Sequence, residues 1–179
     1  NAMSFSAFAR QISNRNFLAP TGFKFTLART PKVDFLAQSA NIPEIGMGSA
    51  VQATYLRDRP VPGDKIQYGD FTLRFIVDED LVNYMELHNW IRGLGYPDSI
   101  AEYQSWINGD ELAADPNTSD GTLLIYNSSF RINAKVNFRG LFPVSLSTIP
   151  FDSSATDVEY VVAEAAFKYD LYDIEKYES

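Results

Sequence analysis

The 179-residue sequence contains no cysteine and a single histidine, His88. The first absence excludes disulfide bonds, thiolate catalysis and cysteine-ligated zinc. The second excludes the ordinary metal sites built from two or three histidines and leaves little for acid–base catalysis at neutral pH. No apolar run approaches the ~20 residues that a membrane-spanning helix needs. We therefore expect no catalytic residues, no cofactor, no metal and no membrane anchor.

Apolar residues make up 45% of the chain and aromatic residues 14%, which is typical of a folded protein with a sizeable core. The length fits one domain on the prior of about 100–200 residues per domain. We expect a tag remnant at 1–2, an N-terminal segment at 3–16 and one β domain over 17–179, with a polar acidic insertion at 98–121. No secretion signal follows Met3, so synthesis in the cytoplasm is expected.

Apolar and polar residues alternate with a period of two in several segments, which indicates strands with one buried face. The expected strands cover residues 23–28, 33–38, 51–56, 71–77, 122–126, 132–138, 144–149 and 161–171. Pro60 and Pro62 lack the N–H that sheet pairing needs, so residues 57–64 are expected to form an extended, exposed connection. Residues 140–143, Gly-Leu-Phe-Pro, are expected to form a turn.

A helix is expected in the middle of the chain, capped at its start by Asp78 or Asp80. Its predicted buried stripe consists of Leu81, Tyr84, Met85, His88 and Ile91. A short second helix is expected over 99–107. Seven strands, with the short additional one at 144–149, and one main helix predict a mainly β protein, an antiparallel sandwich or barrel with one flanking α-helix.

The candidates for chemistry are weak. Asp115, Asn117 and Ser119 have the spacing of calcium ligands, but Asp120 occupies the position that needs glycine and Tyr126 the position that needs glutamate. This segment is therefore predicted to be a solvated turn. The histidine is expected to pack on the apolar side of the helix.

The net charge of −8 is unevenly distributed. Basic and acidic residues number nine and five in 1–75, one and ten in 76–125, three and none in 126–149, and two and eight in 150–179. The three basic residues of the third block share the polar face of one strand: Arg131, Lys135 and Arg139. This basic stripe has two interpretations. It is either a solvent-facing row that prevents strand aggregation or a surface that meets an acidic patch on a neighbouring subunit.

The order of these elements resembles the tail-tube proteins of contractile-tail bacteriophages of the T-even type, which are related to type VI secretion tubes. Three segments carry the resemblance: the strand that leads into the helix at 70–80, the Gly-Leu-Phe-Pro segment at 140–143, and the C-terminal run at 160–175. The resemblance covers most of residues 17–175.

The resemblance implies a structural virion protein rather than an enzyme. Six subunits would close a ring whose strands join into one inner barrel, and rings would stack into a tube that conducts DNA, surrounded by sheath and connected to baseplate and tape-measure proteins. Residues 57–68 would form an arm that reaches a neighbouring ring. The implied contact residues are Arg57, Asp58, Arg59, Asp64, Lys65 and Tyr68. The basic stripe would face either the lumen or a neighbour.

Two alternatives stay open at this point. The first is a baseplate component or tube initiator with the same fold. The second belongs to another class, a monomeric small-ligand-binding β-barrel, in which the thirteen phenylalanines, ten tyrosines and two tryptophans would line a cavity.

Overall fold

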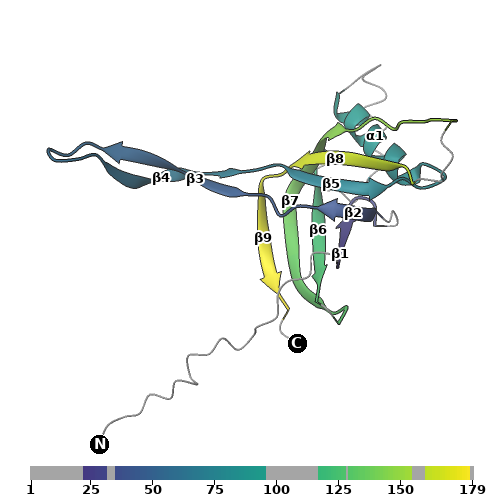
Figure 1. Ribbon diagram of the computed structural model, residues 1–179, viewed down its shortest axis with the longest axis horizontal. Coiled ribbons are helices and arrows are strands. Elements are labelled where there is room, and N and C mark those ends of the chain that lie inside the picture. The colour runs from purple at the N-terminus through teal and green to yellow at the C-terminus, as the bar shows by residue number, and fades with distance from the viewer. Residues whose placement is uncertain (1–21, 32–34, 96–116, 128, 155–159, 178–179) are drawn as a thin grey trace, which may run out of the picture.

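The computed structural model describes residues 22–31, 35–95, 117–127, 129–154 and 160–177. These residues form strands and one helix, all strand pairs being antiparallel (Figure 1). The elements are β1 (Phe23–Leu27), β2 (Leu36–Ala40), β3 (Ile45–Gln52), β4 (Arg59–Tyr68), β5 (Phe71–Ile76), α1 (Val82–Gly95), β6 (Ser119–Tyr126), β7 (Ile132–Leu146), β8 (Val162–Lys168) and β9 (Leu171–Lys176). The predicted fold class, a mainly antiparallel β protein with one main helix, is confirmed.

Some sequence predictions cannot be compared with this structure. The expected second helix at 99–107 lies outside the described residues, as do the segments 1–2 and 3–16 and most of the insertion at 98–121. The end of that insertion is described, and it is not a loop there, because β6 already begins at Ser119.

The long strand β7 belongs to both halves of the body. Its first part pairs with β6 and β9, and its second part pairs with β8. Between the two parts, Gly140 has a φ of +64°, a left-handed conformation that glycine adopts at little cost. The predicted turn at 140–143 is therefore wrong, because the glycine bends the strand without ending it.

The sheet curls around one core. The strand order is β1-β6-β7-β8-β5-β2, and an isolated bridge between Phe25 and Phe35 brings the first and last of these strands together. Aromatic rings fill the interior: the centroid of Phe71 lies 5.1 Å from that of Phe25 and 4.6 Å from that of Phe138. Because these rings contact one another, they give no support to the alternative of a barrel whose aromatic residues line a ligand cavity.

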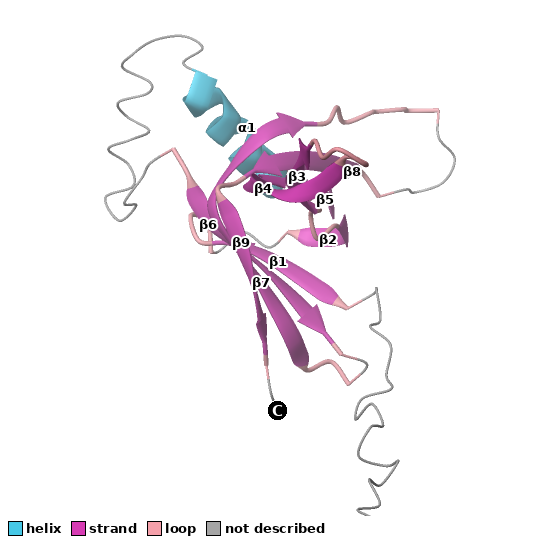
Figure 2. Ribbon diagram, turned by 90° about the vertical axis from the view of Figure 1, so that its left-hand side faces the viewer, coloured by secondary structure: helices cyan, strands magenta, loops and turns pink. Residues whose placement is uncertain are grey.

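Four strands, β1, β6, β7 and β9, lie side by side as one layer (Figure 2). The helix α1 and the β6–β7 hairpin lie at opposite ends of the body (Figure 1). The buried residues of the helix are Asn83, Leu87, Trp90 and Gly93. Among the described residues, no helix is long and apolar enough to cross a membrane.

The predicted buried stripe of the helix is wrong in part, since Met85 and His88 are exposed. The start of the helix explains the difference. Asn83 donates from Nδ2 to the carbonyl of Ile76 (2.9 Å) and accepts at Oδ1 from the N–H of Asp78 (3.2 Å). These two bonds turn Asn83 toward the end of β5, so the face that carries Leu87 and Trp90 is buried.

The predicted single strand at 161–171 is two strands in the structure. β8 ends at Lys168, and β9 begins at Leu171 on the other side of a bend. At the bend the N–H of Asp170 donates to the carbonyl of Arg139 (2.9 Å), which directs the chain away from β5 and onto the first part of β7. The alternation of inward residues therefore changes phase here, and Tyr172 rather than Leu171 faces the core.

Candidate assembly surfaces

Strands β3 and β4 form a separate two-stranded sheet that projects far from the body (Figure 1). We call this ribbon the arm. Residues 57–64, predicted to be an unpaired connection, partly belong to β4, and Pro62 and Pro60 stand opposite Ser49 and Val51. A two-stranded ribbon accommodates these prolines because each strand has one edge without a partner, where no N–H is required. The expected strand at 51–56 is also wrong, since β3 ends at Gln52 and the chain turns back.

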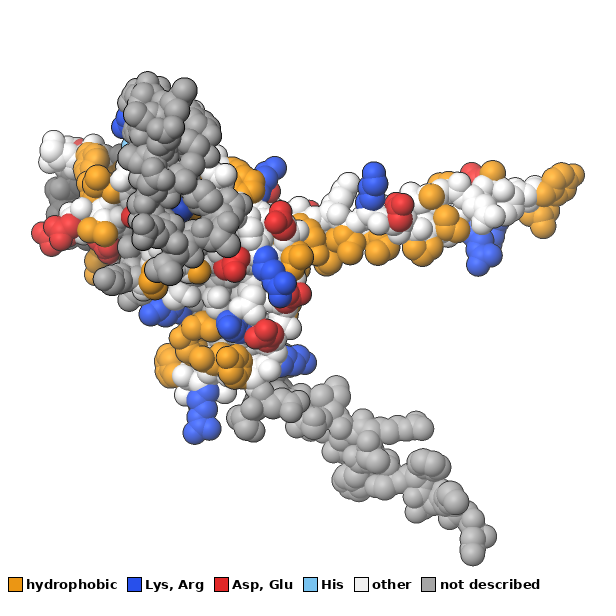
Figure 3. Space-filling view, turned by 180° about the vertical axis from the view of Figure 1, so that it is seen from behind, with side chains coloured by type: hydrophobic (Ala, Val, Ile, Leu, Met, Phe, Trp, Pro, Cys, Tyr) orange, Lys and Arg blue, Asp and Glu red, His pale blue; other side chains and the backbone are white. Residues whose placement is uncertain are grey.

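The arm is amphipathic. β4 contains two more residues than β3 between the pairs Met47–Ile66 and Ser49–Pro62, so side chains keep their face on both sides of the irregularity. One face carries an exposed row of apolar residues, visible along one side of the arm in Figure 3: Ile45, Met47, Val51, Pro60, Pro62 and Ile66. The tip adds Tyr55 and Leu56, which are 103% and 90% exposed.

The predicted contact residues are distributed along the arm. Arg57 and Asp58 lie near its tip, Arg59 begins β4, and Asp64 and Lys65 lie at the irregularity; all five are exposed. Their role as contacts stays a prediction. The sixth, Tyr68, differs from the others because it is half-buried at the root of the arm.

Aromatic residues connect the root of the arm to the core. The rings of Tyr68, Tyr169 and Tyr172 lie 5.6–5.9 Å apart, and Phe138 lies 5.1 Å from Tyr169 and 5.9 Å from Tyr172. Burial raises the pKa of Tyr169 to about 12, with smaller contributions from the two other tyrosines and Asp70. The hydroxyl of Tyr169 therefore keeps its proton and can donate a hydrogen bond well above neutral pH.

The outer face of the four-stranded layer is polar. On β7, Lys135, Asn137 and Arg139 alternate with the buried Val136 and Phe138. The neighbouring strand β9 contributes acidic side chains in the same rows, because Lys135 stands opposite Glu175 and Asn137 opposite Asp173.

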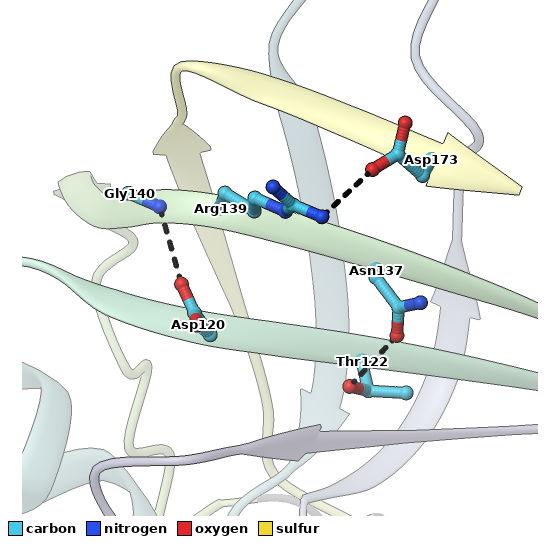
Figure 4. Close-up of polar contacts among 6 residues, drawn as sticks. All are labelled: Asp120, Thr122, Asn137, Arg139, Gly140 and Asp173. Carbon is cyan, nitrogen blue, oxygen red and sulfur yellow. Dashed lines mark hydrogen bonds and ion pairs between the residues drawn. The ribbon is translucent and has the colours of Figure 1, made fainter.

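Figure 4 shows the contacts on this face. The guanidinium of Arg139 lies 3.4 Å from the carboxylate of Asp173, and both side chains are more than half exposed. The hydroxyl of Thr122 on β6 donates to Oδ1 of Asn137 on β7 (3.5 Å). The backbone N–H of Gly140 donates to Oδ1 of Asp120 (3.4 Å). The face is thus a mixture of opposite charges rather than a basic patch.

The predicted basic stripe is brought together only in part. Lys135 and Arg139 share the polar face, while Arg131 lies before β7 in the hairpin, where its N–H donates to Asn127 Oδ1 (3.0 Å). The acidic row that meets the stripe comes from the same chain. Sequence reasoning missed Asp173 and Glu175 because pairing of β7 with β9 joins residues more than thirty positions apart. The sequence signal that could have identified them is their spacing of two residues, which places both side chains on one face of a strand.

Strand β9 is an edge of the four-stranded layer. It pairs with β7 along one edge, and no other described strand pairs with its second edge. Its exposed side chains include Leu171, Ile174 and Glu175. An open edge of this kind is a ready template for pairing with another chain.

Within the described ranges, no three histidine, aspartate or glutamate side chains gather as they would around a metal ion. Asp115, the first residue of the calcium-like spacing, lies outside those ranges.

The chain is similar in sequence and in structure to several known proteins. The tail tube terminator protein of Enterobacteria phage T4 is 26% identical over 116 residues, which are 64% of this chain and 61% of that protein. Among solved structures, the tube-terminating cap of the anti-feeding prophage has a TM-score of 0.62 and 21% identity, with 96% and 99% of the two chains covered. A chain of the sheath–tube complex of the extracellular contractile injection system PVC has a TM-score of 0.59 and 19% identity, with 98% and 100% covered. No family model matches the sequence.

The fold is therefore shared with chains of a tube-terminating cap and of a contractile sheath–tube complex. The expected similarity to tail-tube proteins of contractile-tail phages is confirmed. The chain matches about three fifths of the length of its curated relative.

Proposed function

We propose that this chain is a non-enzymatic subunit of a ring at the end of the tube of a contractile phage tail, the position that a tube terminator occupies. The observation that carries the proposal is two features without a partner among the described residues: the open edge of β9 and the exposed apolar row of the arm. Both features require a partner, and a ring of identical subunits provides one.

Strand directions support closure of a ring. Each neighbouring pair in the order β1-β6-β7-β9 is antiparallel, so β9 runs opposite to β1. A second copy that places its β1 beside β9 therefore continues the antiparallel pattern. Such a contact joins two different surfaces, and repetition of it closes a ring when the rotation between subunits is suitable. We propose six subunits, as the family resemblance implies.

The arm provides the second contact. Ile45, Met47, Val51 and Ile66 are each more than half exposed, and a protein that buries them on a neighbour removes apolar area from water. The arm extends beyond the body in Figure 1, so its partner is another subunit, in the same ring or in the ring next to it.

The polar face is proposed to line the channel. Its basic residues on β7 stand beside acidic residues on β9, so it presents no continuous positive surface to DNA phosphates. Tight phosphate binding depends on neutralisation by Lys and Arg. DNA would therefore pass without being held. The ring would lie in the virion tail after synthesis in the host bacterial cytoplasm, and would contact tube, sheath, baseplate or tape-measure proteins.

A terminator is favoured over a stacking tube subunit because the curated relative and two of the similar structures have terminator or cap in their names. A baseplate position is the runner-up, supported by a likeness to a chain of the anti-feeding prophage baseplate with a TM-score of 0.57 and 9% identity.

The test is light scattering after size-exclusion chromatography, with electron microscopy of the same fractions. A terminator is expected to form discrete rings with six times the 20.1 kDa mass of the chain and no filaments at any concentration. Long filaments would instead indicate a stacking tube subunit. A protein that stays monomeric, even when mixed with the tube and sheath subunits of its own phage, would contradict the proposal.

A further inference from the structure

The two strands of the arm leave the body through short connections that are held by hydrogen bonds. The N–H of Gly69 donates to the carbonyl of Glu44 (2.9 Å) directly beyond the arm. One step further, the side chain of Asn41 donates to the carbonyl of Asp70 (3.1 Å) and accepts from the N–H of Thr72 (2.6 Å). The two connections are therefore fixed to each other at the root.

Two tyrosines fix these connections to the rest of the body. Tyr172 donates its hydroxyl hydrogen to the carbonyl of Pro43 (3.0 Å), before β3, and Tyr169 donates to the carbonyl of Gly69 (2.8 Å), after β4. One bond thus reaches each side of the arm. Tyr169 lies in the bend between β8 and β9, and Tyr172 is the second residue of β9. The ring of Tyr68 packs against the rings of both.

We propose that Tyr169 and Tyr172 are positioning residues that hold the arm at one angle to the four-stranded layer. An eight-residue strand is about 26 Å long at ~3.3 Å per residue, so a tilt of about 10° at the root would move the tip by about 4–5 Å. That displacement exceeds the length of a hydrogen bond. The placement of Tyr55 and Leu56 on a neighbour therefore depends on the angle of the arm at its root.

We call Tyr169 and Tyr172, with their hydrogen bonds to the two connections of the arm, the clamp. The clamp also joins the arm to the edge of the four-stranded layer. Tyr172 is part of β9, where it lies between Leu171 and the Asp173 that contacts Arg139. Under the ring proposed above, on which this step rests, the strand that pairs with the neighbour and the arm that reaches it are one mechanical unit. Pairing at β9 then sets the direction of the arm.

The experiment measures the angle directly. Because the chain has no native cysteine, one spin label can be placed at the tip (Ala53→Cys) and one on the body (Asn133→Cys) without further substitutions. Double electron–electron resonance then gives the distribution of distances between them, and dilution with unlabelled chain keeps each measured pair within one subunit.

The test variant is Tyr169→Phe with Tyr172→Phe, which keeps both rings and removes both hydroxyls. Its matched control is Tyr84→Phe, which removes a hydroxyl that donates to the carbonyl of Ser147 (3.1 Å) within the body, away from the arm. Circular dichroism and thermal unfolding establish that each variant is folded. If the double variant unfolds, each single Tyr→Phe variant is measured instead.

We expect a narrow distribution in the parent and in the control, and loss of that narrow distribution in the clamp variant. A narrow distribution in the folded clamp variant, a broad one in the parent, or equal broadening in the control would each overturn the proposal. The distance is measured whether or not rings form. A failure of the ring proposal is therefore seen in the scattering experiment alone, and a failure of the clamp in the resonance experiment alone.

Discussion

The body and the arm are both built from strands with alternating apolar side chains, but the body buries these side chains and the arm leaves them exposed. In the body, alternate side chains meet in one core, and Phe25, Phe71 and Phe138 are completely buried. In the arm, alternate side chains also form an apolar row, yet Met47, Val51 and Ile66 remain more than half exposed. A two-stranded ribbon is at best marginally stable in water.

Under the proposed function, this difference separates the residues that stabilise the fold from those that hold subunits together. The core stabilises the body of an isolated subunit, while the apolar row of the arm would contribute little until a neighbour covers it. Substitutions should therefore divide into those that change the free energy of unfolding and those that change association. The predictions below run from the largest expected effect on unfolding to the smallest.

The largest effect is expected from Phe138→Ala. This ring contacts Phe71, Tyr169 and Tyr172, and its removal leaves a cavity at the junction of the core and the arm root. Loss of a buried phenylalanine costs about 3–5 kcal/mol in free energy of unfolding. Chemical denaturation measures it. Phe130→Ala, at a position that is 85% exposed, is the control, and an equal loss there would contradict the buried role.

A smaller loss is expected from Gly140→Ala. A left-handed backbone costs an alanine about 1–2 kcal/mol, and its Cβ would lie 2.5 Å from Asp170 Oδ2. Gly46→Ala in the arm is the comparison, because the nearest atom to its Cβ would be 3.8 Å away. Thermal unfolding should show a lower melting temperature for the first variant alone. Equal melting temperatures would mean that the bend in β7 tolerates a side chain.

Reversal of the stripe should affect unfolding little. Lys135→Glu with Arg139→Glu places acidic side chains beside Asp173 and Glu175, on a face where exposed pairs contribute about 0–1 kcal/mol. We expect the fold to persist and rings to form normally, as measured by light scattering, because the proposed channel face is not a subunit contact. Weakened assembly of this double variant would instead place the basic stripe at a contact between subunits.

The smallest effect on unfolding is expected from Met47→Asp with Ile66→Asp on the apolar row of the arm. Exposed substitutions usually change stability by about 0.5 kcal/mol or less. Assembly, however, should be lost, because a charge would be buried against the neighbour. Gln67→Asp on the opposite face of the arm is the control for added charge. If rings form normally from the apolar-row variant, the arm is not a subunit contact.

The sequence predicted the body better than the connections. Period-two runs such as 23–28 and 132–138 identified strands correctly, because alternate burial leaves a direct pattern of apolar residues. The predictions failed where a strand bends without ending. Gly140 indicated a turn, and the long C-terminal run hid a bend after Lys168. Which residue a bend brings next to which strand depends on distant pairing.

The candidate site was predicted in outline only. The exposed character of residues 57–65 could be inferred from their prolines and charges, whereas their pairing with β3 could not. Tyr68 was selected as a contact residue, but the structure places it against Tyr169 and Tyr172, about a hundred residues away. No local pattern contains that information.

The passage of β7 through both halves of the body has a consequence for how the subunit unfolds. A single continuous strand supplies partners to β6, β9 and β8, so the two halves cannot separate without breaking the pairing of β7 with one of them. Amide protons in the two halves should then exchange with solvent through one cooperative opening of the whole body. The arm shares no strand with that unit, so it can lose its pairing first while the core of the body stays folded.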